Sequence, residues 1–209
     1  MIVTIDGPAG AGKSTVARLL AERLGFPHLD TGAMYRALTW LALDRGISLE
    51  DGDALAALAR EQPVGFEDGT VTIAGRNVTA AIREARIDRF VSTVARHPDV
   101  RDVMRGHQRR LAHVGDAVVE GRDIGTVVCP DAEVKVYLVA DPAERARRRQ
   151  IERPEEGAAG LASDLKLRDE RDALQMQPAE DADVIDTTEL SAEEVVDRIE
   201  TLVHSRKSA

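Results

Sequence analysis

A glycine-rich segment near the start of the chain constrains the fold more than any other feature. Residues 2–6 form a short apolar run, which is typical of a buried parallel strand. The pattern Gly7-x-x-x-x-Gly12-Lys13-Ser14 follows, and apolar residues then recur at helical spacing over about residues 14–24. A strand, a glycine loop and a helix in this order are the setting of the Walker A phosphate loop. The segment therefore predicts an α/β fold that binds a nucleoside triphosphate.

The chemistry of this loop assigns a role to its residues. Glycines let the backbone curl so that successive N–H groups point at phosphate oxygens, and the start of the following helix adds its positive dipole end. Lys13 can reach the β- and γ-phosphates, and the Ser14 hydroxyl can ligate Mg²⁺. The predicted nucleotide-binding residues are Gly7, Pro8, Ala9, Gly10, Ala11, Gly12, Lys13, Ser14 and Thr15.

The rest of the chain alternates strand and helix patterns. Further strands are expected over about 26–30, 117–120, 134–139 and 184–186, which implies a parallel sheet covered by helices on both faces. Residues 64–79 differ, because apolar and polar residues alternate there between turn signals. We expect a small antiparallel sheet of two or three strands at this place.

Several helix boundaries follow from capping residues. Thr31 can cap a helix that runs through Leu43, and helices are expected over about 80–95 and 98–113. Residues 141–144 (Asp-Pro-Ala-Glu) form a strong helix start. The remaining expectations are a mobile loop over Pro154–Ser163, a helix over Leu165–Leu174 and a final helix capped by Ser191 and Glu194.

Composition sets limits on the function. The chain has 209 residues, 28 Lys+Arg, 37 Asp+Glu and a net charge of −9, which disfavours a nucleic-acid partner. No apolar run is long enough to span a bilayer, no signal peptide is visible, and the lone Cys129 excludes an internal disulfide framework. We therefore expect a cytoplasmic protein without a membrane partner.

The basic residues are distributed unevenly. Of the 28, 24 are Arg, and five of these fall within residues 145–153. A composition bias with a solvated helix face is one interpretation. Phosphate recognition is the other, because a planar guanidinium can bind phosphate oxygens with two nitrogens.

Two other classes of P-loop protein are disfavoured. GTPases usually carry an Asn-Lys-x-Asp guanine reader, which the sequence lacks, and motor ATPases are usually longer.

Three clusters suggest a second, acceptor site. Residues 30–36 begin a helix after a strand, residues 120–126 place Arg and Asp at a strand end, and Arg168 lies four residues before Asp172. Each cluster alone fits a surface arginine or an ordinary i,i+4 pair. Their joint occurrence favours a phosphotransferase with a phosphate-bearing acceptor.

Over nearly its whole length the chain resembles the bacterial cytidylate kinases, a family of P-loop nucleoside monophosphate kinases. The small sheet predicted over 64–79 also agrees, since bacterial members carry such an insert in the monophosphate-binding region. The motifs that carry the resemblance are Ile5-Asp6-Gly7-Pro8-Ala9-Gly10-Ala11-Gly12-Lys13-Ser14, Leu29-Asp30-Thr31-Gly32-Ala33-Met34-Tyr35-Arg36, Glu120-Gly121-Arg122-Asp123-Ile124-Gly125-Thr126-Val127-Val128 and Arg168-Asp169-x-x-Asp172.

The resemblance implies transfer of the γ-phosphoryl group of ATP, with Mg²⁺, to CMP or dCMP in pyrimidine nucleotide metabolism. It implies catalytic roles for Lys13, Arg122, Asp123 and Arg148, the last in an arginine-rich lid over the phosphates. The acceptor phosphate would be bound by Thr31, Tyr35, Arg36 and Arg122, the cytosine by Ser92, Arg101 and Asp123, and the sugar by Arg168 and Asp172.

The chemistry of the base supports two of these roles independently. Cytosine offers an amine donor beside ring-nitrogen and carbonyl acceptors, so its recognition needs a carboxylate or hydroxyl together with an arginine. Asp123 and Arg101 supply that pair, and such a site disfavours UMP because uracil reverses the donor pattern. Asp6, at a strand end, could hold the metal through water. Gln175 departs from the family, in which many members have Arg at that place.

The expected organisation is a single P-loop kinase domain over 1–209, acting as a monomer without an obligatory protein partner. Its core would comprise about 1–60, 80–140 and 176–209, its insert about 61–80 and its lid about 143–170. Two alternatives stay open. One is another P-loop kinase of the uridylate/cytidylate, adenylate or shikimate type, and the other is a nucleotide-binding regulatory module without turnover.

Overall fold

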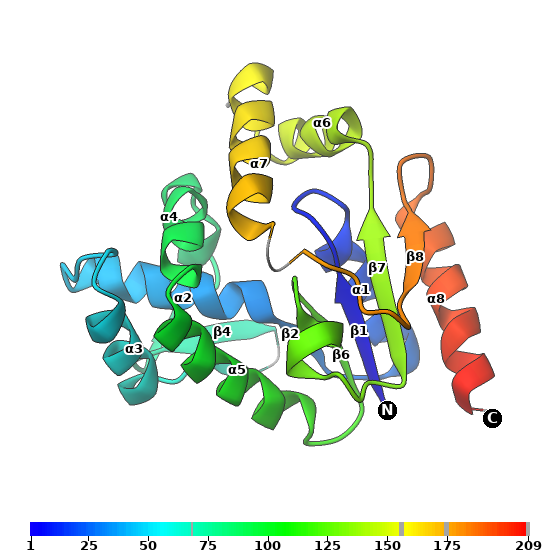
Figure 1. Ribbon diagram of the computed structural model, residues 1–209, viewed down its shortest axis with the longest axis horizontal. Coiled ribbons are helices and arrows are strands. Elements are labelled where there is room, and N and C mark those ends of the chain that lie inside the picture. The colour runs from blue at the N-terminus through cyan, green and yellow to red at the C-terminus, as the bar shows by residue number, and fades with distance from the viewer. Residues whose placement is uncertain (68, 155–156, 174–175, 208–209) are drawn as a thin grey trace. The chain divides into compact units, whose positions relative to one another are not determined.

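In the computed structural model (Figure 1), the chain forms two compact units. The structure describes residues 1–67, 69–154, 157–173 and 176–207. One unit comprises Met1–Leu29 and Ala112–Ala209, and we call it the phosphate-loop unit. The other comprises Asp30–Leu111, and we call it the 30–111 unit.

A five-stranded sheet organises the phosphate-loop unit. The strand order is β2-β6-β1-β7-β8, and the pairs β1–β6, β1–β7 and β7–β8 are all parallel. The central strand β1 is wholly buried, as its continuous apolar sequence predicts. The strands are β1 (Ile2–Asp6), β2 (His28–Asp30), β6 (Ala117–Glu120), β7 (Val134–Val139) and β8 (Asp183–Asp186).

Two helices, α1 (Lys13–Leu24) and α8 (Ala192–Lys207), pack with the sheet in one apolar cluster. Val3 and Ile5 of β1 belong to this cluster, whereas Thr4 between them points to the opposite face, toward Gly125. The unit also contains the short helix η2 (Ile124–Val128) and the helices α6 (Pro142–Glu152) and α7 (Ala158–Asp172).

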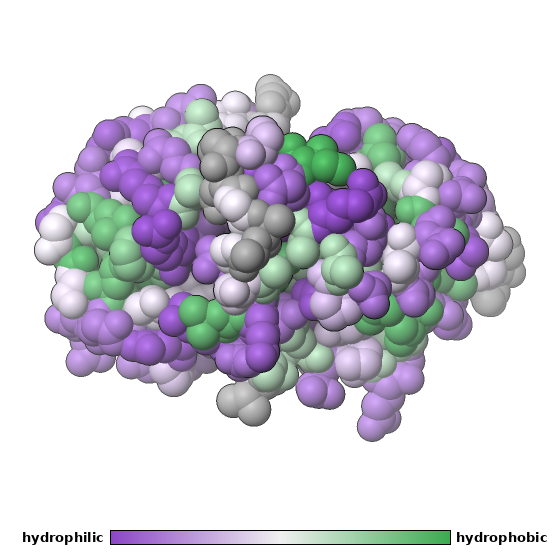
Figure 2. All heavy atoms as spheres, turned by 90° about the horizontal axis from the view of Figure 1, so that it is seen from above, coloured by the Kyte–Doolittle hydropathy of each residue, from purple (hydrophilic) through white to green (hydrophobic). Residues whose placement is uncertain are grey.

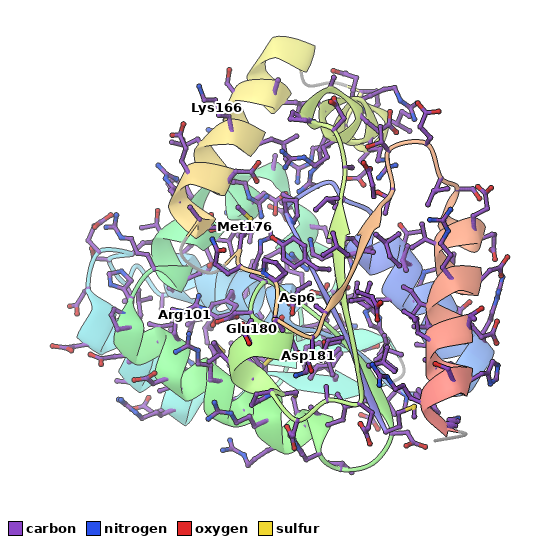
Figure 3. All side chains as sticks on the ribbon, turned by 45° about the vertical axis from the view of Figure 1, so that its right-hand side comes forward. Asp6, Arg101, Lys166, Met176, Glu180 and Asp181 are labelled. Atoms are coloured by element: carbon purple, nitrogen blue, oxygen red, sulfur yellow. The ribbon has the colours of Figure 1, made fainter. Side chains whose placement is uncertain are left out.

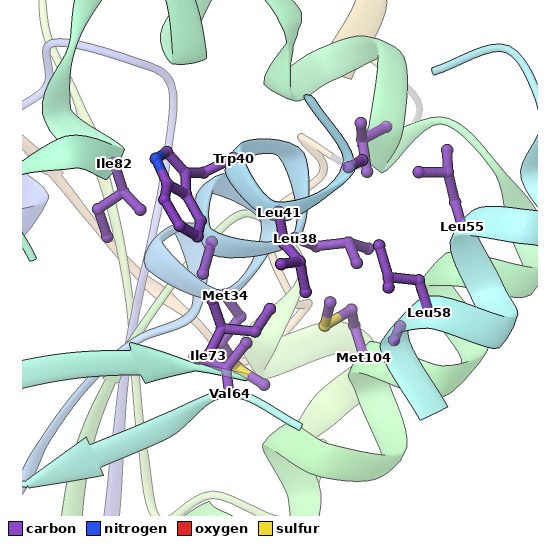
Figure 4. Close-up of a cluster of buried hydrophobic side chains, with 14 of the residues drawn as sticks. Met34, Leu38, Trp40, Leu41, Leu55, Leu58, Val64, Ile73, Ile82 and Met104 are labelled. Carbon is purple, nitrogen blue, oxygen red and sulfur yellow. The ribbon is translucent and has the colours of Figure 1, made fainter. Parts of the chain in front are cut away.

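The 30–111 unit is built around its own hydrophobic core, shown in Figure 4. Met34, Leu38 and Leu41 of α2 project into this core, together with Leu55 and Met104. Its elements are α2 (Thr31–Asp44), α3 (Gly52–Glu61), β3 (Gly65–Glu67), β4 (Thr70–Ile73), β5 (Arg76–Asn77), η1 (Ala81–Arg83), α4 (Ala85–Ala95) and α5 (Pro98–Ala112).

The small antiparallel sheet predicted over 64–79 is confirmed. Strands β3, β4 and β5 form a meander in which Gly65 pairs with Thr72 and Thr72 with Asn77. Together with the parallel sheet flanked by helices, it confirms the predicted fold class. The helix α3 had no counterpart in the sequence-based prediction, although Asp51 caps it by accepting a hydrogen bond from the backbone N–H of Ala54.

Two boundary predictions are wrong. Asp30, not Thr31, caps α2, because the Asp30 carboxylate accepts the backbone N–H of Ala33 at 2.8 Å. The loop predicted over Pro154–Ser163 is shorter, since α7 already begins at Ala158, and the helix predicted through Leu174 is described to Asp172. Leu174 and Gln175 lie outside the described residues.

The face of the molecule seen in Figure 2 is covered mainly by hydrophilic residues, with hydrophobic ones scattered among them. In the described ranges, no helix combines the length and the apolar character that a bilayer-spanning segment requires.

Candidate active site

The phosphate loop between β1 and α1 has the backbone geometry that its glycines predict. Gly7, Gly10 and Gly12 have φ values of 141°, 78° and 90°. Residues with a side chain rarely adopt such angles. A Cβ atom at Gly7 would lie 2.1 Å from the carbonyl oxygen of Leu138. The curled loop and the start of α1 therefore form a cradle of backbone N–H groups suited to phosphate oxygens.

Lys13 is buried beneath this loop, with only 7% of its surface exposed. Its Nζ donates a 2.7 Å hydrogen bond to the carbonyl oxygen of Pro8. Burial holds the pKa of Lys13 well below its usual range, and the nearby positive charge of Arg122 acts in the same direction. The ammonium group therefore lies where a bound polyphosphate would compensate the cost of its burial.

Ser14 is held by a carboxylate that sequence reasoning did not place in the site. The Ser14 hydroxyl donates to Glu120 Oε2 at 2.7 Å, and His28 Nε2 lies 3.0 Å from Glu120 Oε1. Glu120 ends β6, the strand beside β1, so the sheet itself brings it to the loop. The sequence signal was an acidic residue closing a buried strand.

Asp6, at the end of β1, accepts hydrogen bonds from the loop that follows β6. Its two carboxylate oxygens accept the backbone N–H groups of Ile124 and Gly125 at 3.0 and 2.8 Å. Burial raises the pKa of Asp6 to about 6. The structure thus gives Asp6 a role in fixing the loop that carries Arg122 and Asp123, and its metal contact through water stays a prediction.

Arg122 joins two parts of the phosphate-loop unit. Its Nη1 donates to the carbonyl oxygen of Gly7 at 2.9 Å, and its Nε donates to Asp172 Oδ2 at 3.2 Å. One interpretation of the sequence was an ordinary i,i+4 pair of Arg168 and Asp172. The structure pairs the Asp172 carboxylate with Arg122, 50 residues away in the chain. Two predicted acceptor-binding residues are therefore brought together at the phosphate loop.

The arginines of residues 145–153 have different surroundings. Arg147 is exposed and pairs with Glu144. Arg148 also donates a hydrogen bond to Glu144, and its Nη2 donates to the carbonyl oxygen of Thr187 at 2.6 Å. Its Nη1 lies 3.6 Å from the position that a Cβ atom would take at Gly12. These hydrogen bonds, from Arg147 and then Arg148, lower the pKa of Glu144 to about 2. Arg148, a predicted catalytic residue, is thus held beside the phosphate loop.

In the 30–111 unit, Asp30 organises the start of α2. Its Oδ1 caps the helix, and its Oδ2 accepts a 2.6 Å hydrogen bond from Nη2 of Arg36. A Cβ at Gly32 would come within 3.0 Å of Arg36 Nη1, so the glycine leaves room for the guanidinium. The helix start and the arginine together present positive potential for an anion.

The other predicted acceptor residues of this unit lie on three helices. Thr31 and Tyr35 share α2 with Arg36, and Thr31 is 3% exposed. Ser92 is buried on α4. Arg101, on α5, donates from Nη1 to the carbonyl oxygen of Ala95 at 3.3 Å, at the end of α4 (Figure 3 labels it).

The segment that returns from α7 to β8 is anchored to β7. Tyr137 donates from its hydroxyl to the carbonyl oxygen of Met176 at 3.0 Å, and Lys135 Nζ lies 2.9 Å from Asp181 Oδ2. Figure 3 shows Met176 and Asp181 on this segment. The end of α7, which carries Arg168 and Asp172, is therefore tied back to the sheet.

The donor atoms of the phosphate-loop unit match the ligands expected from the sequence. Backbone N–H groups, a helix start and Lys13 suit a triphosphate such as ATP. The Ser14 hydroxyl beside the Glu120 carboxylate is an oxygen set, which is the kind that Mg²⁺ prefers.

Comparison with known proteins connects this geometry to a family. The family described as cytidylate kinase matches residues 3–205. A cytidylate kinase of Shouchella clausii is 48% identical over 98% of this chain and 97% of its own length. One from Limosilactobacillus fermentum is 47% identical over 94% of this chain and 92% of its own length.

Solved structures with the same fold are more distant in sequence. A shikimate kinase from Bacteroides thetaiotaomicron has a TM-score of 0.55 at 15% identity and covers 98% of both chains. A gluconokinase from Sinorhizobium meliloti has a TM-score of 0.54 at 16% identity and covers 99% of this chain and 93% of its own. They support the P-loop kinase fold alone.

Proposed function

Because the chain belongs to the cytidylate kinase family, we propose that it transfers the γ-phosphoryl group of ATP to CMP or dCMP, forming ADP and CDP or dCDP. The observation that carries this proposal is the match of the family over residues 3–205, together with a complete phosphate loop. The resemblance identified from the sequence motifs is thereby confirmed.

On the donor side, we assign ATP to the backbone cradle of residues 7–15. Lys13 would neutralise charge on the β- and γ-phosphates, which explains why an ammonium group is kept in a buried place. We further propose that Ser14 ligates Mg²⁺ and that Glu120 orients its hydroxyl. When bound, the ion would neutralise charge on the phosphates of ATP.

On the acceptor side, we assign the phosphate of CMP to the arginines that are already oriented by carboxylates. Arg36 is held by Asp30, and Arg122 is held by Asp172. A guanidinium fixed in this way loses little further freedom on binding a phosphate. The residues that we propose as contacts to the acceptor are Thr31, Tyr35, Arg36, Ser92, Arg101, Arg122, Asp123, Arg168 and Asp172.

The proposed mechanism needs no covalent intermediate. The acceptor phosphate oxygen is already an anion, so the chain has to position the two phosphates and neutralise charge rather than remove a proton. Lys13, Arg122 and Arg148 would supply the positive charge. Arg148 is well placed for this role because Glu144 and Thr187 fix it beside the phosphate loop. Closure of the arginine-rich lid would exclude water from the transferring group.

A monophosphate panel tests the function. ADP release is measured with MgATP and CMP, dCMP, UMP or AMP, and the products are identified by chromatography. We expect the rate of ADP release to be at least about tenfold higher with CMP or dCMP than with UMP or AMP. The reason is that Arg101 and Asp123 are expected to match the donors and acceptors of cytosine. Equal or better turnover of AMP would contradict the proposed substrate. ATP binding with no turnover of any monophosphate would instead indicate a regulatory nucleotide-binding module.

Further assignments complete the proposal. We propose that the chain acts as a monomer without an obligatory protein partner. We also propose that it has no nucleic-acid partner, in agreement with its acidic net charge of −9. We also propose a cytoplasmic setting, which the substrates themselves favour.

A further inference from the structure

Arg145 stands apart from the other arginines of residues 145–153 because it is buried. Only 8% of its surface is exposed. Its Nη1 donates to the carbonyl oxygen of Ala9 in the phosphate loop at 3.1 Å, and its Nη2 lies 2.7 Å from Oδ2 of Asp169 on α7. One side chain of α6 therefore bridges the phosphate loop and α7.

The bridge is closely packed. A Cβ at Gly10 would lie 3.0 Å from Cβ of Arg145 and 3.2 Å from its carbonyl oxygen. The first turn of α6 therefore lies directly on the phosphate loop, and α6 packs against α7, as Figure 1 shows. A buried guanidinium is costly unless it is paired, and Ala9 and Asp169 supply partners for its two Nη atoms.

A second bridge has the same form. Arg122 also joins a carbonyl oxygen of the phosphate loop to a carboxylate of α7, in this case Asp172. Asp169 and Asp172 are three residues apart and therefore lie on one face of the helix. Two arginines from different elements thus hold the same face of α7 to the same loop.

We propose that Arg145 and Asp169 are positioning residues for phosphoryl transfer. They act through two groups that bind the nucleotides: the backbone of the phosphate loop, and the end of α7 with Arg168 and Asp172. This inference rests on the proposed function. It assigns a role to Arg145 and Asp169, which the sequence analysis placed in an arginine run and in a motif but gave no individual role.

The physical reason is the sensitivity of the reaction to distance. The hydrogen bond from Arg145 to the carbonyl oxygen of Ala9 fixes the backbone of the loop, whose N–H groups are proposed to bind phosphate oxygens. The same guanidinium fixes how far α7 lies from the loop. Because displacement of a reacting group by about 1 Å can cost on the order of a hundredfold in rate, a loosened bridge slows transfer without removing any phosphate contact.

A different role for Arg145 makes a different prediction. Arg145 could instead bind the phosphates of ATP directly, after its guanidinium leaves Asp169. In that case Asp169→Asn would release the guanidinium for ATP binding, and removal of Arg145 would weaken ATP binding. As a positioning residue it affects transfer, while ATP affinity is retained.

The experiment compares three variants of the full chain. In Asp169→Asn the side chain keeps its shape but loses the charge that pairs with Arg145. We expect kcat/KM for CMP to fall at least about tenfold, equivalent to about 1.4 kcal/mol. The dissociation constant of MgATP, measured by equilibrium titration, should stay within about threefold of the wild type. Asp169→Glu keeps the carboxylate and should recover part of the lost rate.

Asp164→Asn is the matched control, because Asp164 is an exposed carboxylate on the same helix. It should behave as the wild type in both measurements. The inference is overturned if Asp169→Asn behaves as Asp164→Asn does, or if its ATP affinity falls in parallel with transfer.

A double-mutant cycle tests that the two residues act together. Arg145→Lys keeps the positive charge but cannot donate from two nitrogens at once. Combined with Asp169→Asn, it should lose no more rate than the worse single variant, since both changes break the same bridge. A loss equal to the product of the two single losses would contradict the bridge.

The wild-type protein separates this inference from the proposed function. If the wild type does not phosphorylate CMP, the proposed function is wrong. If it does and the variants show no selective loss of transfer, only the positioning role is wrong.

Discussion

The two units of the chain differ in the kind of phosphate site that we propose for each. In the phosphate-loop unit, the proposed ATP contacts come mainly from backbone N–H groups of one continuous segment, shaped by Gly7, Gly10 and Gly12. In the 30–111 unit, the proposed acceptor contacts are side chains from α2, α4 and α5, and a partner such as Asp30 orients one of them.

The difference follows from what each ligand requires. A triphosphate is recognised by its charge and shape, and a curled backbone can supply both over nine adjacent residues. A base is recognised by its pattern of donors and acceptors, which only side chains can match. Changes in the phosphate loop should therefore affect every substrate alike, whereas changes among the acceptor side chains of the 30–111 unit should alter the choice of acceptor.

The largest expected effect is that of Lys13→Met. Removing the buried ammonium should lower kcat at least about a hundredfold with every monophosphate, since a charge that stabilises the transferring group is lost. Lys207→Met, at the exposed end of α8, is the control. Steady-state rates of ADP formation measure the effect. A loss of less than about tenfold would show that Lys13 is not central to charge neutralisation.

Arg36→Met should have the next largest effect, and it should be confined to the acceptor. We expect the KM for CMP to rise roughly ten- to a hundredfold, because a charge-assisted bond to the acceptor phosphate is removed. The KM for ATP should change little. Arg86→Met removes an exposed arginine of the same unit and serves as the control. A parallel rise in both KM values would argue against a separate acceptor role.

Asp172→Ala tests a residue that has two proposed roles, one toward the acceptor and one toward Arg122. It removes the proposed sugar contact and also the partner of Arg122. We expect kcat/KM for CMP to fall about tenfold with little change in ATP affinity. If the KM for CMP and kcat are both unchanged, Asp172 is only a structural partner of the arginine.

The smallest effects are expected from two helix caps, one in each unit. Asp141→Ala removes the cap of α6, and Asp51→Ala removes that of α3. Each should lower the free energy of unfolding by about 1 kcal/mol, as measured by urea denaturation. Asp141→Ala should also lower the rate of transfer, because the first turn of α6 carries Arg145. Equal loss of rate in both variants would indicate a general effect of stability.

Features encoded within a few neighbouring residues could be predicted from the sequence. The phosphate loop is one, since its glycines, Lys13 and Ser14 are adjacent. The capping box of the last helix is another, in which Ser191 and Glu194 exchange hydrogen bonds as expected. The meander of β3, β4 and β5 follows from alternation and turn residues.

Helix caps and helix starts were harder to predict where adjacent residues offer more than one choice. Asp30 and Thr31 are both good capping residues, and the structure selects Asp30, which also bonds Arg36. The abundance of Gly, Ala and Glu over Pro154–Ser163 predicts a loop at the start of α7. Burial of Leu161 and Leu165 at helical spacing outweighs that composition.

Pairings over long sequence distances could not be predicted at all. Ser14 and Glu120 are 106 residues apart, and Ala9 and Arg145 are 136 residues apart. Their contacts depend on the order of strands in the sheet and on how α6 lies on the loop. Neither follows from local propensity, so the positioning residues became visible only in the folded chain.

The ratio of kcat/KM for CMP to that for UMP tests the division of roles most directly. It should be measured in the wild type and in Arg101→Met, with the exposed Arg109→Met on the same helix as control. We expect the ratio to fall at least about tenfold in Arg101→Met, while the KM for ATP stays within about threefold of the wild type. An unchanged ratio, or a loss of ATP affinity equal to the loss of CMP use, would contradict the division of roles.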